Sequence, residues 1–144
     1  MTILLEQSEA VRARAILALF CCLWLGGAAA TFLFRVADRV HAARALRAAS
    51  YPCRDAKVLA LYRRCAVVLG ISSPPPLRQF LPGVRLSPCL CGVVRPAVYI
   101  GGELAAMPES AAKMILLHEL SHLRARDPWL SLAASAAASL HWMN

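Results

Sequence analysis

Two histidines and a glutamate are spaced so that they could hold a metal ion and act beside it. They lie in the stretch His118-Glu119-Leu120-Ser121-His122. In an α-helix, residues four apart are separated by about 40° around the axis and roughly 6 Å along it, so both imidazoles point the same way. Glu119 lies on the same side and borders the metal position without being needed as a ligand. Two neutral imidazoles beside a carboxylate that can take a proton from water are the arrangement of a zinc peptidase.

The flanking residues predict that this stretch is helical, from Pro108 to Arg126. Pro108 suits the first helical position, and Glu109 complements the positive end of the helix dipole. Asp127-Pro128 ends the helix, because a residue before proline avoids the helical conformation. An apolar stripe at helical spacing, with Leu117 beside it, is predicted to include both histidines; its members are Ala111, Met114, Ile115, His118 and His122.

The alternative interpretation is a pair of ordinary core or surface histidines, since a His-Glu-x-x-His string also arises by chance. The helical context favours the metal, because buried histidines without a partner are costly and a metal is a natural partner.

A long uncharged run precedes this helix. Ala15 to Phe34 contains no charged residue and is bounded by Arg14 and Arg35. Its 20 residues would span about 30 Å as a helix, which is the hydrocarbon thickness of a bilayer. A secretory signal peptide is the rival interpretation, with Ala28-Ala29-Ala30 as its cleavage site. The apolar part is too long for that, so we predict a retained transmembrane helix.

The basic residues predict the orientation of this helix. The chain has a net charge of +8, and a cluster of arginines follows the span closely: Arg35, Arg39, Arg44, Arg47 and Arg54. The positive-inside rule then places the rest of the chain on the cytoplasmic side of the cell membrane. Attraction to membrane lipid headgroups accounts for this charge. Direct nucleic-acid binding is not predicted, because no reading motif accompanies the arginines.

The remaining pattern predicts an α+β fold with a membrane anchor. We divide the chain into an N-terminal segment (1–14), the transmembrane helix (15–34), a basic juxtamembrane segment (35–54), a zinc-peptidase-like domain (55–127) and an apolar helix (128–144) that is either packed on the domain or the start of a membrane helix. The basic segment should continue the helix until Tyr51-Pro52-Cys53 breaks it. A second helix is expected over Asp55 to Leu69, and short strands over Leu77 to Leu81, Arg85 to Cys91 and Ala97 to Ile100.

The cysteines are not predicted to form a site. Two of the six lie in the span and the others face a reducing cytoplasm, so disulfides are not expected. Cys89 and Cys91 lack the spacing and partners of a metal site. We interpret them as alternating side chains of a strand.

The ordered set of motifs resembles the integral-membrane zinc peptidases of the BlaR/MecR beta-lactam sensor-transducer family. The resemblance covers roughly residues 55 to 144 and the preceding membrane helix. It rests on Ser87-Pro88, Gly92, Pro96, Tyr99-Ile100, the His118–His122 stretch, Arg126-Asp127 and His141-Trp142-Met143-Asn144.

This resemblance implies a gluzincin-like domain, facing the cytoplasm between membrane helices, that cleaves a transcriptional repressor or triggers its cleavage. It implies that His118 and His122 bind zinc and that Glu119 is the general base. It also implies a further glutamate as third metal ligand, downstream of the His-Trp-x-Asn stretch with which this sequence ends.

The third ligand is therefore expected outside these 144 residues, as in a fragment or a shortened relative. Within them, substitutes with unconvincing spacing are Glu103, Glu109, Asp127 and His141. The sequence leaves three hypotheses open. The first is a membrane-anchored zinc endopeptidase that acts on a protein substrate in signal transduction, the second a housekeeping membrane protease similar to the HtpX-like proteases, and the third a truncated, non-catalytic membrane module.

Overall fold

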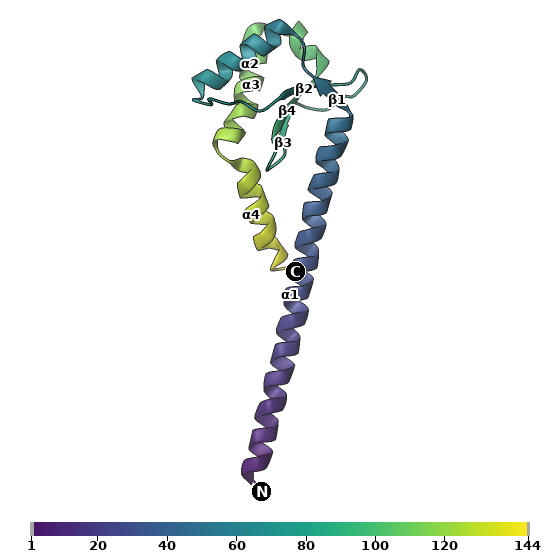
Figure 1. The fold of residues 1–144 in the computed structure, drawn as a ribbon, viewed down its shortest axis with the longest axis vertical. Coiled ribbons are helices and arrows are strands. Elements are labelled where there is room, and N and C mark those ends of the chain that lie inside the picture. Colours follow the sequence, from purple (N-terminus) through teal and green to yellow (C-terminus); the bar gives the residue numbers. More distant parts are fainter. Residues whose placement is uncertain (1, 144) are drawn as a thin grey trace. The chain divides into compact units, whose positions relative to one another are not determined.

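The computed structural model describes residues 2–143 and shows a mixed α+β fold (Figure 1). Its elements, in chain order, are α1 (Thr2–Ala48), β1 (Ser50–Pro52), α2 (Ala56–Val68), β2 (Leu77–Phe80), β3 (Cys89–Cys91), β4 (Ala97–Ile100), the 3-10 helix η1 (Gly102–Ala106), α3 (Glu109–Arg124) and α4 (Asp127–Ser139). The chain divides into two compact units, one made of residues 1–36 and 134–144 and the other of residues 37–133.

Helix α1 is continuous through the predicted span and the basic segment after it. Within the described residues, one helix is long and apolar enough to cross a membrane, and it covers Val11–Ala48. Large apolar side chains of the span, such as Leu23 and Phe34, are exposed. Such side chains need an apolar surrounding, which a bilayer provides. The helix passes Arg35 without a break, as the sequence predicted for the basic segment.

In the first unit, the predicted span packs against residues near the C-terminus, and small residues lie at the contact. The indole of Trp142 packs against Gly27, where a β-carbon would collide with it. Its Nε1 donates a hydrogen bond of 3.1 Å to the carbonyl of Trp24. Ala28 on α1 and Ser139 on α4 are buried in this unit. Small side chains let two helices approach closely, which is how helices pack in membranes.

In the second unit, a four-stranded sheet has the order β1-β2-β4-β3. β1 is antiparallel to β2, β2 is parallel to β4, and β3 is antiparallel to β4, with Leu90 opposite Val98. The predicted strand 97–100 is confirmed, and the strand predicted over Leu77 to Leu81 ends one residue earlier. The strand predicted over Arg85 to Cys91 is shorter and begins only after Pro88, because proline cannot donate to a ladder.

Strand β1 was not predicted, because Pro52 favoured a simple break of the chain. The strand forms at the edge of the sheet, where a missing N–H is tolerated. Arg78 of β2 fixes its start: Nε donates to the hydroxyl of Ser50 at 2.9 Å, and Nη2 donates to the carbonyl of Ser50 at 2.7 Å and to that of Arg47 at 3.1 Å. The end of α1 is therefore bonded directly to the sheet.

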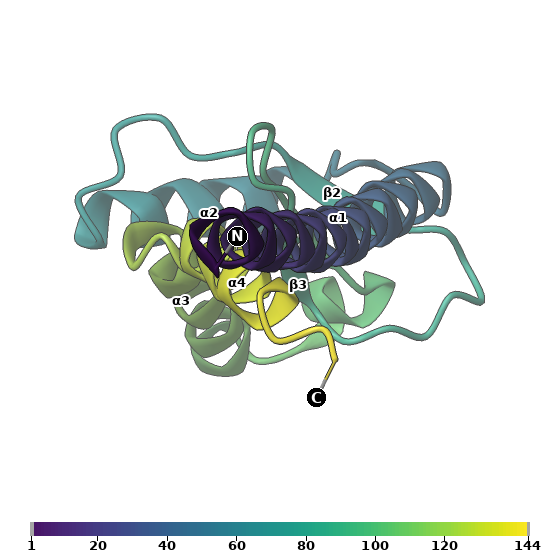
Figure 2. The same cartoon turned by 90° about the horizontal axis from the view of Figure 1, so that it is seen from below.

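The two faces of the sheet carry different apolar clusters. Val98 and Ile100 face the larger one, which α2 and α3 complete with Leu61, Cys65, Leu116 and Leu120. Ala97 and Tyr99 face the smaller one with Phe80, and Cys89 and Cys91 pack against it. Figures 1 and 2 show α2 and α3 side by side, in agreement with their contacts. The larger cluster thereby holds α3, which carries the histidines, on the sheet.

Candidate metal centre

Helix α3 forms where the sequence predicted it, with slightly different ends. Pro108 is the residue before the helix rather than its first residue, with an extended ψ of 141°. The helix ends at Arg124, and Arg126 has a positive φ of 58°. A left-handed residue commonly follows a helix end, although the position usually carries glycine. This conformation ends α3 and lets Asp127 begin α4 only five residues after His122.

The buried side of α3 differs from the predicted stripe. Its buried residues are Ala112, Leu116, Glu119 and Leu120. Met114, a member of that stripe, is 71 % exposed, and His118 is exposed as well. The prediction that both histidines lie on the apolar side is therefore wrong. The core takes the neighbouring stripe, because α2 and the sheet cover that side of α3.

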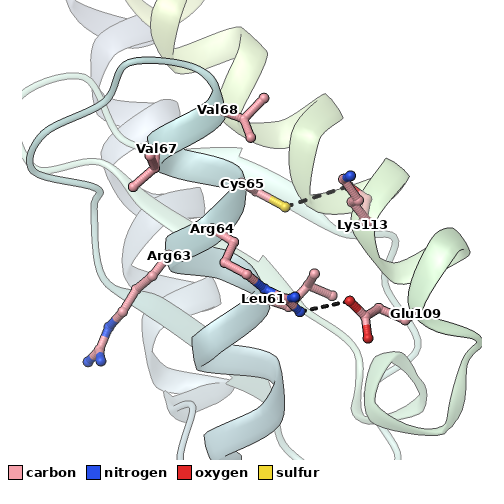
Figure 3. Close-up of a pocket in the computed structure, with 8 residues that line it drawn as sticks. All are labelled: Leu61, Arg63, Arg64, Cys65, Val67, Val68, Glu109 and Lys113. Atoms are coloured by element: carbon pink, nitrogen blue, oxygen red, sulfur yellow. Dashed lines mark hydrogen bonds and ion pairs between the residues drawn. The ribbon is translucent and has the colours of Figure 1, made fainter.

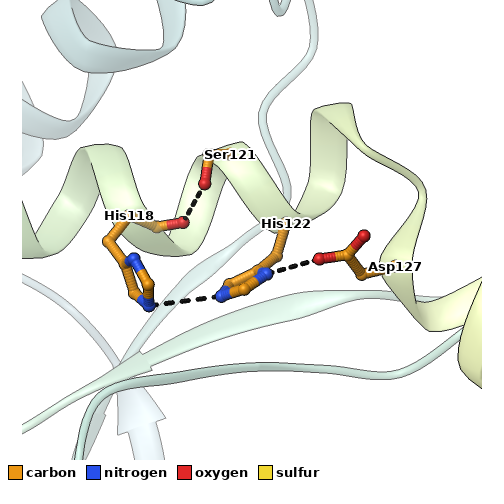
Figure 4. A network of polar contacts seen from close by, with 4 residues as sticks. All are labelled: His118, Ser121, His122 and Asp127. Atoms are coloured by element: carbon orange, nitrogen blue, oxygen red, sulfur yellow. Dashed lines mark hydrogen bonds and ion pairs between the residues drawn. The ribbon is translucent and has the colours of Figure 1, made fainter.

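The two imidazoles converge on one point at the edge of this helix (Figure 4). The Nε2 atoms of His118 and His122 are 3.2 Å apart, and the two ring planes meet at 82°. The hydroxyl of Ser121 donates to the carbonyl of His118 at 2.7 Å and so lies outside the pair.

The donor set agrees with zinc. Two nitrogens about 2.0–2.1 Å from a tetrahedral zinc ion lie roughly 3.3 Å apart. The Nε2 separation of 3.2 Å is close to that value. Both nitrogens are on an accessible side of the helix, and the side chain of His122 is 40 % exposed. The two residues could therefore share one ion with little movement of their rings.

Asp127 contacts the imidazole of His122 at the ring nitrogen that does not face His118. Its Oδ2 lies 2.5 Å from Nδ1 of His122. Nδ1 points away from His118, so this carboxylate binds the ring and not the shared metal position (Figure 4). Metal-binding histidines commonly donate their other N–H to a carboxylate, which fixes the tautomer and the ring orientation. The sequence analysis predicted Asp127 as a helix end and named it as a substitute ligand, and it did not predict this role; the position just beyond the helix end was the signal for it.

The third ligand stays a prediction. Within residues 2–143, the structure gathers no group of three or more His, Cys, Asp or Glu side chains that could hold a metal. Glu109 forms an exposed ion pair of 2.7 Å with Arg64. Glu103 follows the sheet in η1, and His141 lies in the other compact unit. Of the three substitutes that lie in the same unit as the pair, Glu103, Glu109 and Asp127, none forms a three-residue group with it among the described residues.

Glu119, the predicted general base, lies on the buried side of α3 and not on the exposed side with His118. The residue is 7 % exposed, and among the described residues its carboxylate has no hydrogen-bond or ion-pair partner. Among the described residues, every fully buried side-chain oxygen has a hydrogen-bond partner. Because the Glu119 carboxylate has no such partner, its oxygens are not fully buried and still reach solvent. A carboxylate in this state can accept a proton from water.

The edge strand β3 lies next to this carboxylate. Strand β3 contacts α3 and is the last strand of the sheet within the described residues. Burial, followed by the neighbouring Cys91 thiol and Glu119 carboxylate, raises the pKa of Cys89 to about 11. Burial also raises the pKa of Cys91. Both thiols are therefore neutral near pH 7. Their place on β3 confirms the interpretation that they are side chains of a strand.

A helix with two converging imidazoles and a buried glutamate, beside the last described strand of a sheet, is typical of metallopeptidases. The family described as BlaR1 peptidase M56 matches residues 2–144, and the chain belongs to it. This confirms the resemblance to the BlaR/MecR family. Comparisons with curated proteins and with solved structures found no match. Together with the apolar helix α1, the family identifies a membrane-associated peptidase or sensor-transducer of the BlaR1 type.

Proposed function

We propose that the chain is a membrane-anchored zinc endopeptidase that cleaves a protein substrate at the cytoplasmic face of the membrane. The observation that supports this most strongly is the 3.2 Å separation of the two Nε2 atoms, which suits a shared zinc ion. The family supports a metallopeptidase in general. The arginines after the span support the cytoplasmic side through the positive-inside rule.

The residues of α3 divide the chemistry between them. His118 and His122 hold the ion through Nε2, and Asp127 keeps His122 in the tautomer that leaves this nitrogen free to bind. When bound there, zinc supplies Lewis acidity that polarises a water molecule and the scissile carbonyl. Glu119 takes the proton of the attacking water and delivers it to the leaving amine.

The sheet provides a place for the substrate. An extended peptide can pair with the free edge of β3 through main-chain hydrogen bonds, as peptides do on other exposed sheet edges. Because β3 contacts α3 and its Cys89 lies in the field of Glu119, a peptide on that edge passes close to the general base. The protein substrate that we propose is a transcriptional repressor, as the family resemblance implies. This would link cleavage to signal transduction.

Metal removal tests this proposal. We expect the full chain, inserted in phospholipid vesicles and loaded with zinc, to cleave fluorescein-labelled casein. A chelator such as 1,10-phenanthroline should stop cleavage, and added zinc should restore it. The release of labelled peptides measures the rate. Cleavage that is indifferent to the chelator, or no cleavage at any zinc concentration, would contradict the proposal and favour a non-catalytic membrane module.

A further inference from the structure

A groove lies between α2 and α3, on another side of α3 from the metal centre. It has a volume of about 490 Å³ and is lined by Leu61, Arg63, Arg64, Cys65, Val67, Val68, Glu109 and Lys113 (Figure 3). At about 100° per residue, Glu109 and Lys113 lie roughly 180° and 140° around the helix from His118. An occupant of the groove would therefore leave the imidazoles accessible.

The groove combines an apolar surface with a basic rim. Leu61 and Cys65 are buried, whereas Val67 and Val68 are 76 % and 66 % exposed. Two neighbouring valines that are this exposed at the end of a helix form an apolar surface that no other described element covers. Three cationic side chains and one carboxylate line the groove, which leaves it a net charge of +2.

Three contacts join α2 and the residue after it to α3. Arg64 of α2 pairs with Glu109 of α3 at 2.7 Å. At the C-terminal end of α2, Nη1 of Arg124 donates to the carbonyl of Leu69 at 3.1 Å. Between them, the Cys65 thiol lies 4.0 Å from the carbonyl of Lys113. Neither Arg63 nor Lys113 forms an ion pair with a carboxylate among the described residues. Two cations thus stay available to an acidic partner.

We propose that this groove binds a segment of a partner protein that presents apolar side chains flanked by acidic residues. The volume lies in the range of sites that take a few side chains, roughly 300–1,000 Å³. A helical segment laid along the rim of this groove would place its apolar residues on the valines and its carboxylates on Lys113 and on Arg63, which extends away from α3 (Figure 3). The inference does not depend on peptidase activity.

Other occupants fit less well. A second copy of this chain carries the same net charge of +8 and would meet the basic rim with like charge. A bilayer is flat and would leave the floor of a groove unfilled. An acidic, protruding segment satisfies both the shape and the charge.

A peptide-binding experiment tests the inference. The full-length Glu119→Gln chain, held in neutral detergent micelles so that it cannot cut the probe, is titrated with a fluorescein-labelled helical peptide. The peptide carries leucines at i, i+3 and i+7 with glutamates between them. Fluorescence anisotropy should show saturable binding that weakens with salt. A matched peptide with lysines in place of the glutamates should bind at least 10-fold more weakly.

Variants of the groove distinguish specific docking from general charge attraction. Arg63→Glu with Lys113→Glu should weaken binding at least 10-fold, whereas Arg85→Glu with Arg95→Glu, which makes the same charge change outside the groove, should not. Val67→Asp is a second test, because it changes the apolar surface of the groove and keeps Arg63 and Lys113. It should also weaken binding of the peptide. Equal binding of the two peptides, or equal effects of the two double variants, would overturn the inference. It would also be overturned if the groove variants lost only self-association or only binding to anionic vesicles.

Discussion

Replacing Glu119 with glutamine should reduce the rate of substrate cleavage by about 10²- to 10⁴-fold, which is the usual contribution of a general base. Glutamine has the size of glutamate but cannot take a proton from water. Because the Glu119 carboxylate has no protein partner among the described residues, the exchange breaks no hydrogen bond or ion pair of that part of the fold. Zinc content and thermal stability should therefore stay close to those of the unchanged chain.

The matched control is Glu109→Gln. It makes the same exchange on the same helix, at an exposed residue that is far around the axis from the histidines. Its loss of the pair with Arg64 should matter little, because exposed ion pairs contribute only about 0–1 kcal/mol. Cleavage at an unchanged rate by the Glu119→Gln chain, with the protein folded and zinc bound, would remove the general-base assignment.

Replacing Asp127 with asparagine should weaken zinc binding by about 10- to 100-fold, the usual cost of losing an outer-shell carboxylate. Asparagine can still accept a hydrogen bond from Nδ1 of His122. It carries no negative charge, so the imidazole becomes a weaker ligand and its orientation is less firmly fixed. Asp127 is thus a positioning residue that acts through His122. Titration of zinc against a competing chelator of known affinity measures the effect.

A merely structural role for Asp127 would give a different result. Asp127 is also the first residue of α4, where a negative charge favours the helix dipole. If that were its main contribution, Asp127→Asn would lower the melting temperature of the metal-free chain but leave zinc affinity unchanged. The expected pattern is the reverse: a small change of melting temperature and a clear loss of affinity. Unchanged zinc affinity would contradict the positioning role.

Local patterns predicted the helices well. Asp55, predicted as the first residue of the second helix, instead caps α2 by accepting hydrogen bonds from the N–H groups of Lys57 and Val58. Gly70 follows that helix with a φ of +70°, a conformation that glycine adopts readily. The His-Glu-x-x-His helix was predicted from Pro108 and Glu109 at its start and from Asp127-Pro128 at its end. These signals act between residues close in the chain, and they can therefore be read from sequence alone.

Features that depend on distant partners were predicted less well. Strand β1 needs β2 as its partner and the Arg78 guanidinium to fix its start, and neither is visible around Pro52. Met114 fits a helical stripe, yet it is exposed because α2 and the sheet cover the neighbouring side of α3. Asp127 turns back to His122 only because Arg126 adopts a positive φ. Each of these outcomes is decided by tertiary contacts that spacing does not encode.

The most direct test of the metal centre is X-ray absorption spectroscopy at the zinc edge of the full, zinc-loaded chain. We predict a shell that contains two imidazole nitrogens at about 2.0–2.1 Å, one of which disappears in His118→Ala and one in His122→Ala. A zinc shell without imidazole, or a spectrum that neither substitution changes, would show that the two histidines of α3 do not share a zinc ion.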